Sequence, residues 1–167
     1  MLKGQDIVVL LALAGRPPVT MRETAARIAF DPAGVTRSLR RLTEAGLYSR
    51  ERDAVLLPQA EEFLVHGLRY VFPARMAGES RGLATAWAAP PLDGEFGETA
   101  SLPPVWMHPE GTVRGIALEP LHEIVPAAAL ADARTWRLLA LVDAFRVGDA
   151  RVRGVARGHL HDELRRG

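Results

Sequence analysis

The side chains with the most distinctive chemistry are three arginines close together in the sequence, Arg37, Arg40 and Arg41. Around them, Val35, Leu39 and Leu42 recur at i, i+4 and i+7, which predicts an amphipathic helix with an apolar core stripe. At about 100° per residue, the three arginines then share the solvated face. Guanidinium groups near a helix N-terminus suit entry into the DNA major groove and contact with phosphate.

Arg37 lies nearest to the start of this predicted helix, so it is the candidate for bidentate contact with guanine. Thr36 and Ser38 flank the core stripe and are placed to reach phosphate. Arg50 and Arg52 follow in a short predicted hairpin, where minor-groove or backbone contacts are usual. The predicted DNA-binding residues are therefore Thr36, Arg37, Ser38, Arg40, Arg41, Arg50 and Arg52.

Two earlier helices must position this one. Residues 2–14 are apolar nearly all round, which predicts a helix buried on most sides or shared with a partner subunit. Pro17 and Pro18 follow it and cannot continue a helix. Thr20 and Glu23 have the spacing of a capping box, which predicts the start of a second helix. Its apolar stripe at i, i+4 and i+7 consists of Met21, Ala25 and Ile28.

The predicted arginine helix has clear boundaries. Asp31 is a suitable N-cap, and Pro32 occupies the first helical position. Gly46 is placed for a left-handed C-cap. Residues 47–50 and 54–57 predict two short strands, and residues 59–71 a further helix.

The segment V-T-M-R-E-T-A-A-R-I-A-F followed by D-P-A-G-V-T-R-S-L-R-R-L-T-E-A-G-L, residues 19–47, resembles the winged-helix DNA-binding domains of bacterial regulators. Regulators of the multiple-antibiotic-resistance-repressor (MarR) type are among them. The resemblance covers the small residue within the first helix, Ala25 or Ala26, the apolar spacing of the second helix and its E-A-G-L corner. It implies a helix-turn-helix with a short wing and DNA as the partner. An arginine-rich face can also be merely solvated, and winged helices also serve as protein-docking modules.

The middle of the chain differs in composition. Residues 73–126 hold eight of the twelve prolines and six glycines, and we expect an irregular segment with one strand at residues 112–119. Helices are expected at residues 133–146 and 149–166. The expected fold is mainly α, with an N-terminal winged helix-turn-helix carrying a minimal β-wing and C-terminal helices. The predicted domains are residues 1–72, the irregular segment 73–126 and a helical segment 127–167.

Composition excludes several function classes. The chain of 167 residues has no cysteine, so disulfides, thiolate metal sites and cysteine nucleophiles are excluded. The longest apolar run, residues 7–14, is far shorter than the roughly 20 residues that span a bilayer. No phosphate loop or nucleophile motif is present. Glu119 and His122 would share a helix face, but a single such pair among prolines is typical of a solvated loop. We expect a cytoplasmic protein, with no membrane partner, enzymatic activity, cofactor, catalytic residue or metal site.

Charge is distributed unevenly along the chain. Residues 1–57 hold nine basic and six acidic residues, a net charge of +3, whereas residues 58–131 hold four and nine, a net charge of −5. One interpretation is a repressor-type transcriptional regulator that binds double-stranded DNA as a homodimer. Its subunits would meet through the first helix or the helix at residues 133–146. A ligand-sensing form would have its pocket between that helix and the one at residues 59–71.

The alternative is an antitoxin-like protein that neutralises a partner enzyme and also represses its own operon. The acidic, proline-rich residues 73–131 would then wrap the partner. Aromatic and arginine side chains are enriched at interface hot spots. The candidate partner-binding residues are Tyr70, Phe72, Arg75, Trp87 and Trp106.

Overall fold

The computed structural model describes residues 1–98 and 101–167 and is mainly helical. The first elements are α1 (Gly4–Leu13), α2 (Met21–Arg27) and α3 (Pro32–Glu44). A hairpin follows, with β1 (Tyr48–Ser49) antiparallel to β2 (Ala54–Val55). These elements confirm the predicted order of three helices and two short strands. None of the helices in the described residues is long and apolar enough to cross a membrane.

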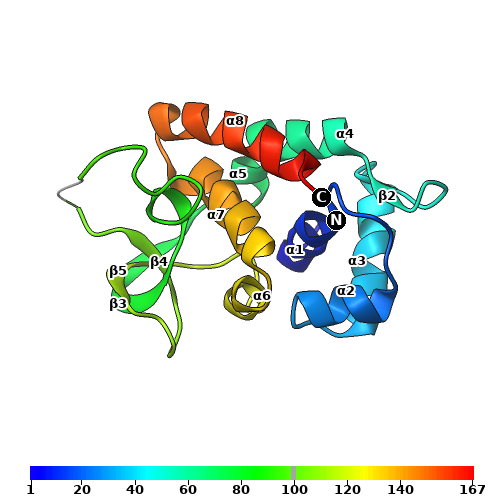
Figure 1. Cartoon of the computed structure of the whole chain (residues 1–167), viewed down its shortest axis with the longest axis horizontal. Coiled ribbons are helices and arrows are strands. Elements are labelled where there is room, and N and C mark those ends of the chain that lie inside the picture. The colour runs from blue at the N-terminus through cyan, green and yellow to red at the C-terminus, as the bar shows by residue number, and fades with distance from the viewer. Residues whose placement is uncertain (99–100) are drawn as a thin grey trace.

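Helix α1 lies at the centre of the molecule, between α3 and α7 (Figure 1). Its residues Ile7 to Ala12 have no exposed surface. The predicted all-round apolar helix is thus explained by neighbours within the same chain on several sides. It is not a surface for a second subunit, because these side chains are already covered.

The caps of α2 and α3 confirm the sequence prediction. The Glu23 N–H donates to Thr20 Oγ1 at 3.1 Å, and the Thr20 N–H donates to Glu23 Oε2 at 2.8 Å. At α3, the Gly34 N–H donates to Asp31 Oδ1 at 2.7 Å. Gly46 ends the helix with φ of 74°, a conformation in which other residues are strained.

The apolar stripes are confirmed with one exception. In α3, Val35 and Leu42 are fully buried and Leu39 is nearly so, and in α2 Ala25 is buried. Ile28, just past the end of α2, is buried as well. Met21 is exposed, against the prediction, because it is the first residue of α2 and lies at the edge of the core.

The predicted helix at residues 59–71 is present, beginning two residues earlier and including one irregular turn. It consists of α4 (Leu57–Glu62), a π-helical turn η1 (Phe63–Gly67) and α5 (Leu68–Val71). Within it, Ala60, Leu64 and Leu68 are fully buried.

The middle of the chain is not irregular, which corrects the prediction for residues 73–126. It contains β3 (Met76–Ala84), a short 3₁₀ helix η2 (Ala86–Ala88), β4 (Pro104–Met107) and β5 (Val113–Leu118). Strand β3 is antiparallel to both β4 and β5, which pair with each other in parallel, so each of the three strands pairs with both others. The strand expected at residues 112–119 is β5.

Glycine and surface exposure together explain why the sequence did not predict β3. A Cβ on Gly82 would lie 2.0 Å from the Trp106 carbonyl oxygen, and one on Gly115 would lie 2.2 Å from that of Pro103. The three strands therefore approach through bare backbone at these points. Most of β3 is exposed, so it lacks the apolar alternation by which a strand is recognised in a sequence.

Three helices complete the chain: α6 (Val125–Ala131), α7 (Ala133–Val147) and α8 (Ala150–Arg165). Helix α7 packs against α1, α6, α8 and η2, and residues from Leu138 to Phe145 are buried. This helix, like α1, is therefore unavailable as a subunit interface. One apolar core includes residues from all three predicted domains, while the boundaries at residues 72 and 126 stay a prediction.

A buried polar cluster joins the three-stranded sheet to α7. Asp143 accepts hydrogen bonds from Thr85 Oγ1 at 2.7 Å, Trp106 Nε1 at 2.8 Å and Arg146 Nη1 at 2.8 Å. Arg146 Nε also donates to the Phe72 carbonyl at 2.9 Å. Burial raises the pKa of Asp143, against the lowering effect of Arg146 and the two other donors.

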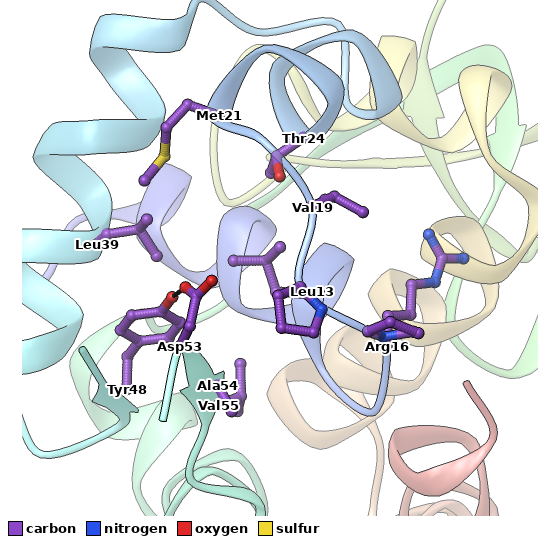
Figure 2. A pocket seen from close by; sticks show the side chains of 12 residues that line it. Leu13, Arg16, Val19, Met21, Thr24, Leu39, Tyr48, Asp53, Ala54 and Val55 are labelled. Carbon is purple, nitrogen blue, oxygen red and sulfur yellow. Dashed lines mark hydrogen bonds between the residues drawn. The ribbon is translucent and has the colours of Figure 1, made fainter. Parts of the chain in front are cut away.

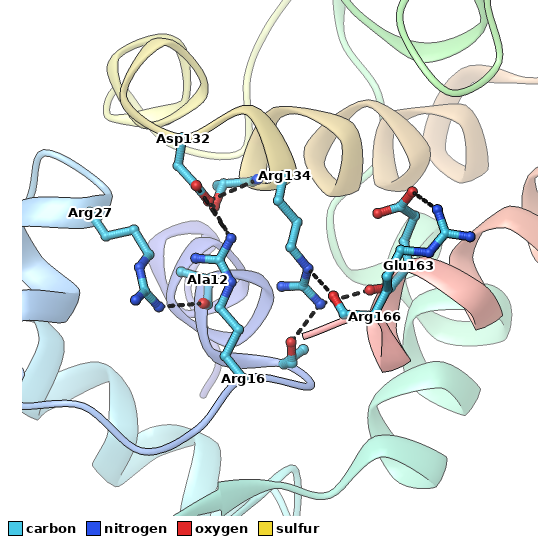
Figure 3. A network of polar contacts seen from close by, with 9 residues as sticks. Ala12, Arg16, Arg27, Asp132, Arg134, Glu163 and Arg166 are labelled. Atoms are coloured by element: carbon cyan, nitrogen blue, oxygen red, sulfur yellow. Dashed lines mark hydrogen bonds and ion pairs between the residues drawn. The ribbon is translucent and has the colours of Figure 1, made fainter.

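A second polar network joins the segment after α1 to α7 and α8 (Figure 3). Arg134 donates to the carbonyl oxygens of Ala14, Glu163 and Arg166 at 2.6, 2.7 and 2.8 Å. Beside it, Arg16 Nη2 forms an ion pair with Asp132 at 2.9 Å. The last helix is thereby fastened to the first.

Candidate nucleic-acid interface

Helices α2 and α3 and the β1–β2 hairpin form one end of the molecule, and the three-stranded sheet lies at the other (Figure 1). The first end carries all seven residues predicted to bind DNA. In the structure, five of these residues are exposed at the surface and two are not.

Arg37 and Arg40 point outward from α3, with 57% and 61% of their side-chain surface exposed. Their nearest carboxylates are at the limit of an ion pair: Arg37 Nη2 lies 3.9 Å from Asp31, and Arg40 Nε lies 4.0 Å from Glu44. Exposed pairs of this kind contribute about 0–1 kcal/mol. Both guanidinium groups are therefore available to another anion.

Three acidic side chains at this end are held by local hydrogen bonds. Glu23 and Asp31 accept from backbone N–H groups at the helix caps, and Asp53 accepts from the Tyr48 hydroxyl. The Thr20 hydrogen bonds lower the pKa of Glu23. These three carboxylates are directed toward their own elements, whereas Glu44 and Glu51 are exposed beside the arginines.

Ser38 is fully buried, so the prediction that it reaches phosphate is wrong. It lies three residues after Val35 and four before Leu42, and it therefore continues the buried stripe. Its Oγ has no hydrogen-bond partner among the described residues. Thr36 is exposed as predicted, and its hydroxyl donates to the Pro32 carbonyl at 3.1 Å.

Arg41 is not on the solvated face, which corrects a second predicted contact. Its Nε and Nη2 donate to the two oxygens of Asp6 at 2.8 and 2.6 Å. Only 11% of the Arg41 side chain is exposed, and Asp6 is completely buried. This hydrogen bonding raises the pKa of Arg41. Because the Arg41 guanidinium is already bound to Asp6 in this bidentate pair, it is not available to contact DNA.

Arg50 and Arg52 are exposed in the hairpin turn, as predicted. The Arg52 N–H donates to Ser49 Oγ at 3.2 Å, and the Tyr48 hydroxyl donates to Asp53, which has φ of 47°. The pKa of Tyr48 is raised, mainly by burial and to a lesser extent by this hydrogen bond. The hairpin is therefore closed by its own side chains.

The hairpin packs closely against the two helices. Figure 2 shows Tyr48 and Asp53 meeting beside Leu39 of α3 and Met21 of α2. The hollow between them has a volume of about 20 Å³, which is enough for about one water molecule. The three elements therefore present one continuous surface.

Sequence reasoning missed two residues at this end. Arg22 is exposed in the first turn of α2, two residues after the Thr20 cap that marks the start of the helix. Asp6 was overlooked as the partner of Arg41. The signal was available, because a lone carboxylate in an otherwise apolar helix needs a cation when it is buried.

The predicted partner-binding residues also divide. Tyr70 is 72% exposed and Arg75 is exposed, whereas Phe72 and Trp87 are half-buried against the core. Trp106 is fully buried and donates to Asp143, so it is wrong as a partner contact. Tyr70 accepts a hydrogen bond from Arg69 Nη2 at 2.8 Å, and the Arg69 guanidinium lies 4.8 Å from the Tyr70 ring centre.

The expected ligand pocket between α5 and α7 is occupied by direct packing of these helices. A hollow of about 240 Å³ lies at their end, lined by Val71, Phe72 and Arg146. Arg146 is nearly buried and is already bonded to Asp143. In the described residues, no group of three or more His, Asp or Glu side chains is placed to hold a metal ion.

Comparison with known proteins adds no relative: no family model, curated protein or solved structure matches this chain.

Proposed function

We propose that this protein is a sequence-specific DNA-binding transcriptional regulator, of repressor type, with α3 as the recognition helix of a winged helix-turn-helix. The observation that supports it best is the exposure of Arg37 and Arg40 on a helix with a well-formed N-cap. Two guanidinium groups with only weak internal partners on one helix face suit readout of guanine and phosphate.

The neighbouring elements support the same proposal. Arg50 and Arg52 in the β1–β2 hairpin and Arg22 in α2 add exposed cations on either side of α3. In the proposed complex α3 enters the major groove, and the flanking arginines contact phosphate and set the register. Because phosphate contacts release counterions, affinity should fall steeply with salt concentration.

A homodimer on a palindromic site remains part of the proposal, with a different interface. Helices α1 and α7 are covered within the chain, so the contact must use other side chains. Tyr70, Val71 and Met76, close together in the sequence, are large exposed apolar residues. We propose this patch as the subunit contact.

The proposal is tested with the charge-removing double variant Arg37→Gln/Arg40→Gln. The probes are DNA from upstream of the protein's own gene and duplexes selected from a random pool, and affinity is measured by fluorescence anisotropy over a range of salt concentrations. Each lost phosphate contact lowers the slope of log affinity against log salt by about 0.9. We expect a large loss of affinity and a slope smaller by up to about 2.

The matched control is Arg81→Gln/Arg157→Gln, which removes the same charge from exposed positions on β3 and α8. It should keep the affinity and slope of the wild-type protein. If both double variants bind DNA equally well, α3 is not the reading element. If the wild-type protein selects no duplex from the pool, the proposed function is wrong.

The second candidate is the antitoxin-like interaction protein. Its support is now the exposed Tyr70 and Arg75, since a folded sheet replaces the irregular segment that was expected to wrap a partner. A stoichiometric partner captured from the native host by the wild-type protein, but not by Tyr70→Ala, would favour this function. Loss of homodimer in Tyr70→Ala without loss of any partner would favour the regulator.

A further inference from the structure

We propose that Asp6 and Arg41 are a positioning pair for DNA binding. Arg41 holds α3 to α1 through Asp6, and neither side chain touches DNA. The inference rests on the proposed function, and it gives Arg41, which the sequence predicted as a DNA contact, a supporting role instead.

The two side chains form a buried bidentate ion pair. Arg41 Nε and Nη2 bind separate oxygens of the same carboxylate at 2.8 and 2.6 Å, so the guanidinium plane is held at two points. Asp6 is fully buried, and Arg41 is largely so. The pair thus adds a fixed orientation at the Arg41 position to the packing of Val35, Leu39 and Leu42 in the core.

Asp6 is itself held by several contacts. Asp6 lies in the first turn of α1, and its Oδ2 also accepts the Lys3 N–H at 2.7 Å. A Cβ on Gly4 would lie 1.7 Å from the Leu121 carbonyl oxygen, so the start of α1 is packed directly on the segment between β5 and α6. From Ile7 onward the helix is enclosed by the core. The carboxylate therefore has a defined place in the molecule.

The Asp6–Arg41 pair helps to fix the positions of the side chains proposed to reach DNA. Arg41 follows Arg40 directly and lies one helical turn after Arg37, so a rotation or tilt of α3 that breaks the pair moves both exposed arginines. The Asp31 cap holds the first turn of α3, and the Asp6 contact holds its third turn. Binding sites require their contacting groups within about 0.5 Å and 10–20° of the productive geometry.

The decisive variant is Asp6→Asn, because the positioning role predicts a change in affinity opposite in sign to the two other hypotheses for Arg41. Removing a negative charge should strengthen DNA binding if only long-range electrostatics matter. It should also strengthen binding if it frees Arg41 to contact phosphate. If the pair positions α3, binding should weaken, and we expect a loss of about tenfold, which is within the range of couplings between contacting residues.

Affinity is measured by anisotropy with the duplex selected by the wild-type protein, at a temperature where circular dichroism shows the variant fully folded. Unchanged or tighter binding by folded Asp6→Asn would overturn the proposal. A loss of affinity comparable to that of Arg40→Gln, from a residue with no exposed surface, supports it.

Arg41→Lys is the second variant and covers the case in which Asp6→Asn does not fold. Lysine keeps the charge but lacks the planar fork. A phosphate contact would survive this exchange with little change in affinity, and that result would refute the positioning role. A positioning pair loses its second hydrogen bond, so we expect weaker binding with the salt slope of the wild-type protein.

Different results would contradict the proposed function and the positioning role. If the wild-type chain binds no duplex, the proposed function falls and takes this inference with it. If the wild-type chain and the Arg40→Gln comparison behave as expected while Asp6→Asn binds normally, only the positioning role is wrong.

Discussion

Gly34 is the residue of α3 whose presence is least expected from helix propensity. Glycine in a helix costs about 1 kcal/mol relative to alanine, which makes this position look like a weakness of the proposed recognition helix. The structure gives the reason for it. A Cβ at position 34 would lie 2.5 Å from the Phe30 ring, and the centre of this ring lies 6.0 Å from that of His122. Glycine is the residue that lets Phe30 fill this corner.

We therefore expect Gly34→Ala to destabilise the protein although alanine is the better helix former. Overpacking of this kind costs about 1–3 kcal/mol, which exceeds the gain in propensity. The change is measured as the free energy of unfolding in urea. The matched control is Gly158→Ala on α8, where a Cβ meets no atom within 4 Å. This substitution should raise the free energy of unfolding by about 0.5–1 kcal/mol. A stabilised Gly34→Ala variant would show that Phe30 moves away at little cost.

At the scale of the elements, the sequence predicted best where local chemistry decides. Thr20 with Glu23, Asp31 with Pro32, and Gly46 marked the helix ends, because caps are local hydrogen bonds. The exposed face of α3 followed from periodicity. Periodicity could not predict the burial of Arg41, because the partner of Arg41, Asp6, lies 35 residues away. The same holds for β3, whose pairing depends on close backbone approach at Gly82 rather than on an apolar pattern.

The start of α7 gives a prediction at this scale. Asp132 caps α7 through Thr135 and pairs with Arg16 of the segment after α1. Burial alone would raise the pKa of Asp132, but the Thr135 hydrogen bonds and the Arg16 charge outweigh burial and lower it. The folded-state pKa thus lies below the unfolded value of about 3.9. This group therefore contributes stability above that value, and the contribution is lost as the pH falls through the folded-state pKa.

We expect the free energy of unfolding of the wild-type protein to fall between about pH 5 and pH 2 more than that of Asp132→Asn. Urea unfolding at successive pH values measures it. Arg16→Gln should show an intermediate dependence, because Thr135 still binds the carboxylate. Parallel pH curves for the wild-type protein and Asp132→Asn would contradict the role of this ion pair.

At the scale of the whole molecule, α1 connects the proposed DNA-binding end to the rest. It packs against α3 on one side and α7 on another, and one core runs through the chain. The helices after the sheet thus contribute to the environment of α3 without touching its outward face. Burial within the chain also explains why both helices first considered for a dimer are apolar on so many sides.

This arrangement predicts that residues 1–72 do not fold alone. Without α7 and α8 the fragment would expose the apolar face of α1, and uncovered apolar surface costs about 25 cal/mol per Å². Circular dichroism and amide hydrogen exchange should show no cooperative unfolding transition for the fragment, in contrast to the full chain. A fragment that unfolds cooperatively and binds the selected duplex would show that the N-terminal elements form an autonomous domain.

The hydrogen bond from Arg134 to the Ala14 carbonyl spans 120 residues of sequence, and this separation has a consequence for synthesis in the cell. At about 5–20 residues per second, a ribosome completes α7 roughly ten seconds after α1. Throughout that interval the face of α1 that packs on α7 is uncovered, and contacts of such long sequence separation form slowly even afterwards. The nascent chain is therefore expected to depend on chaperones, and its yield on the rate at which its last helices are translated.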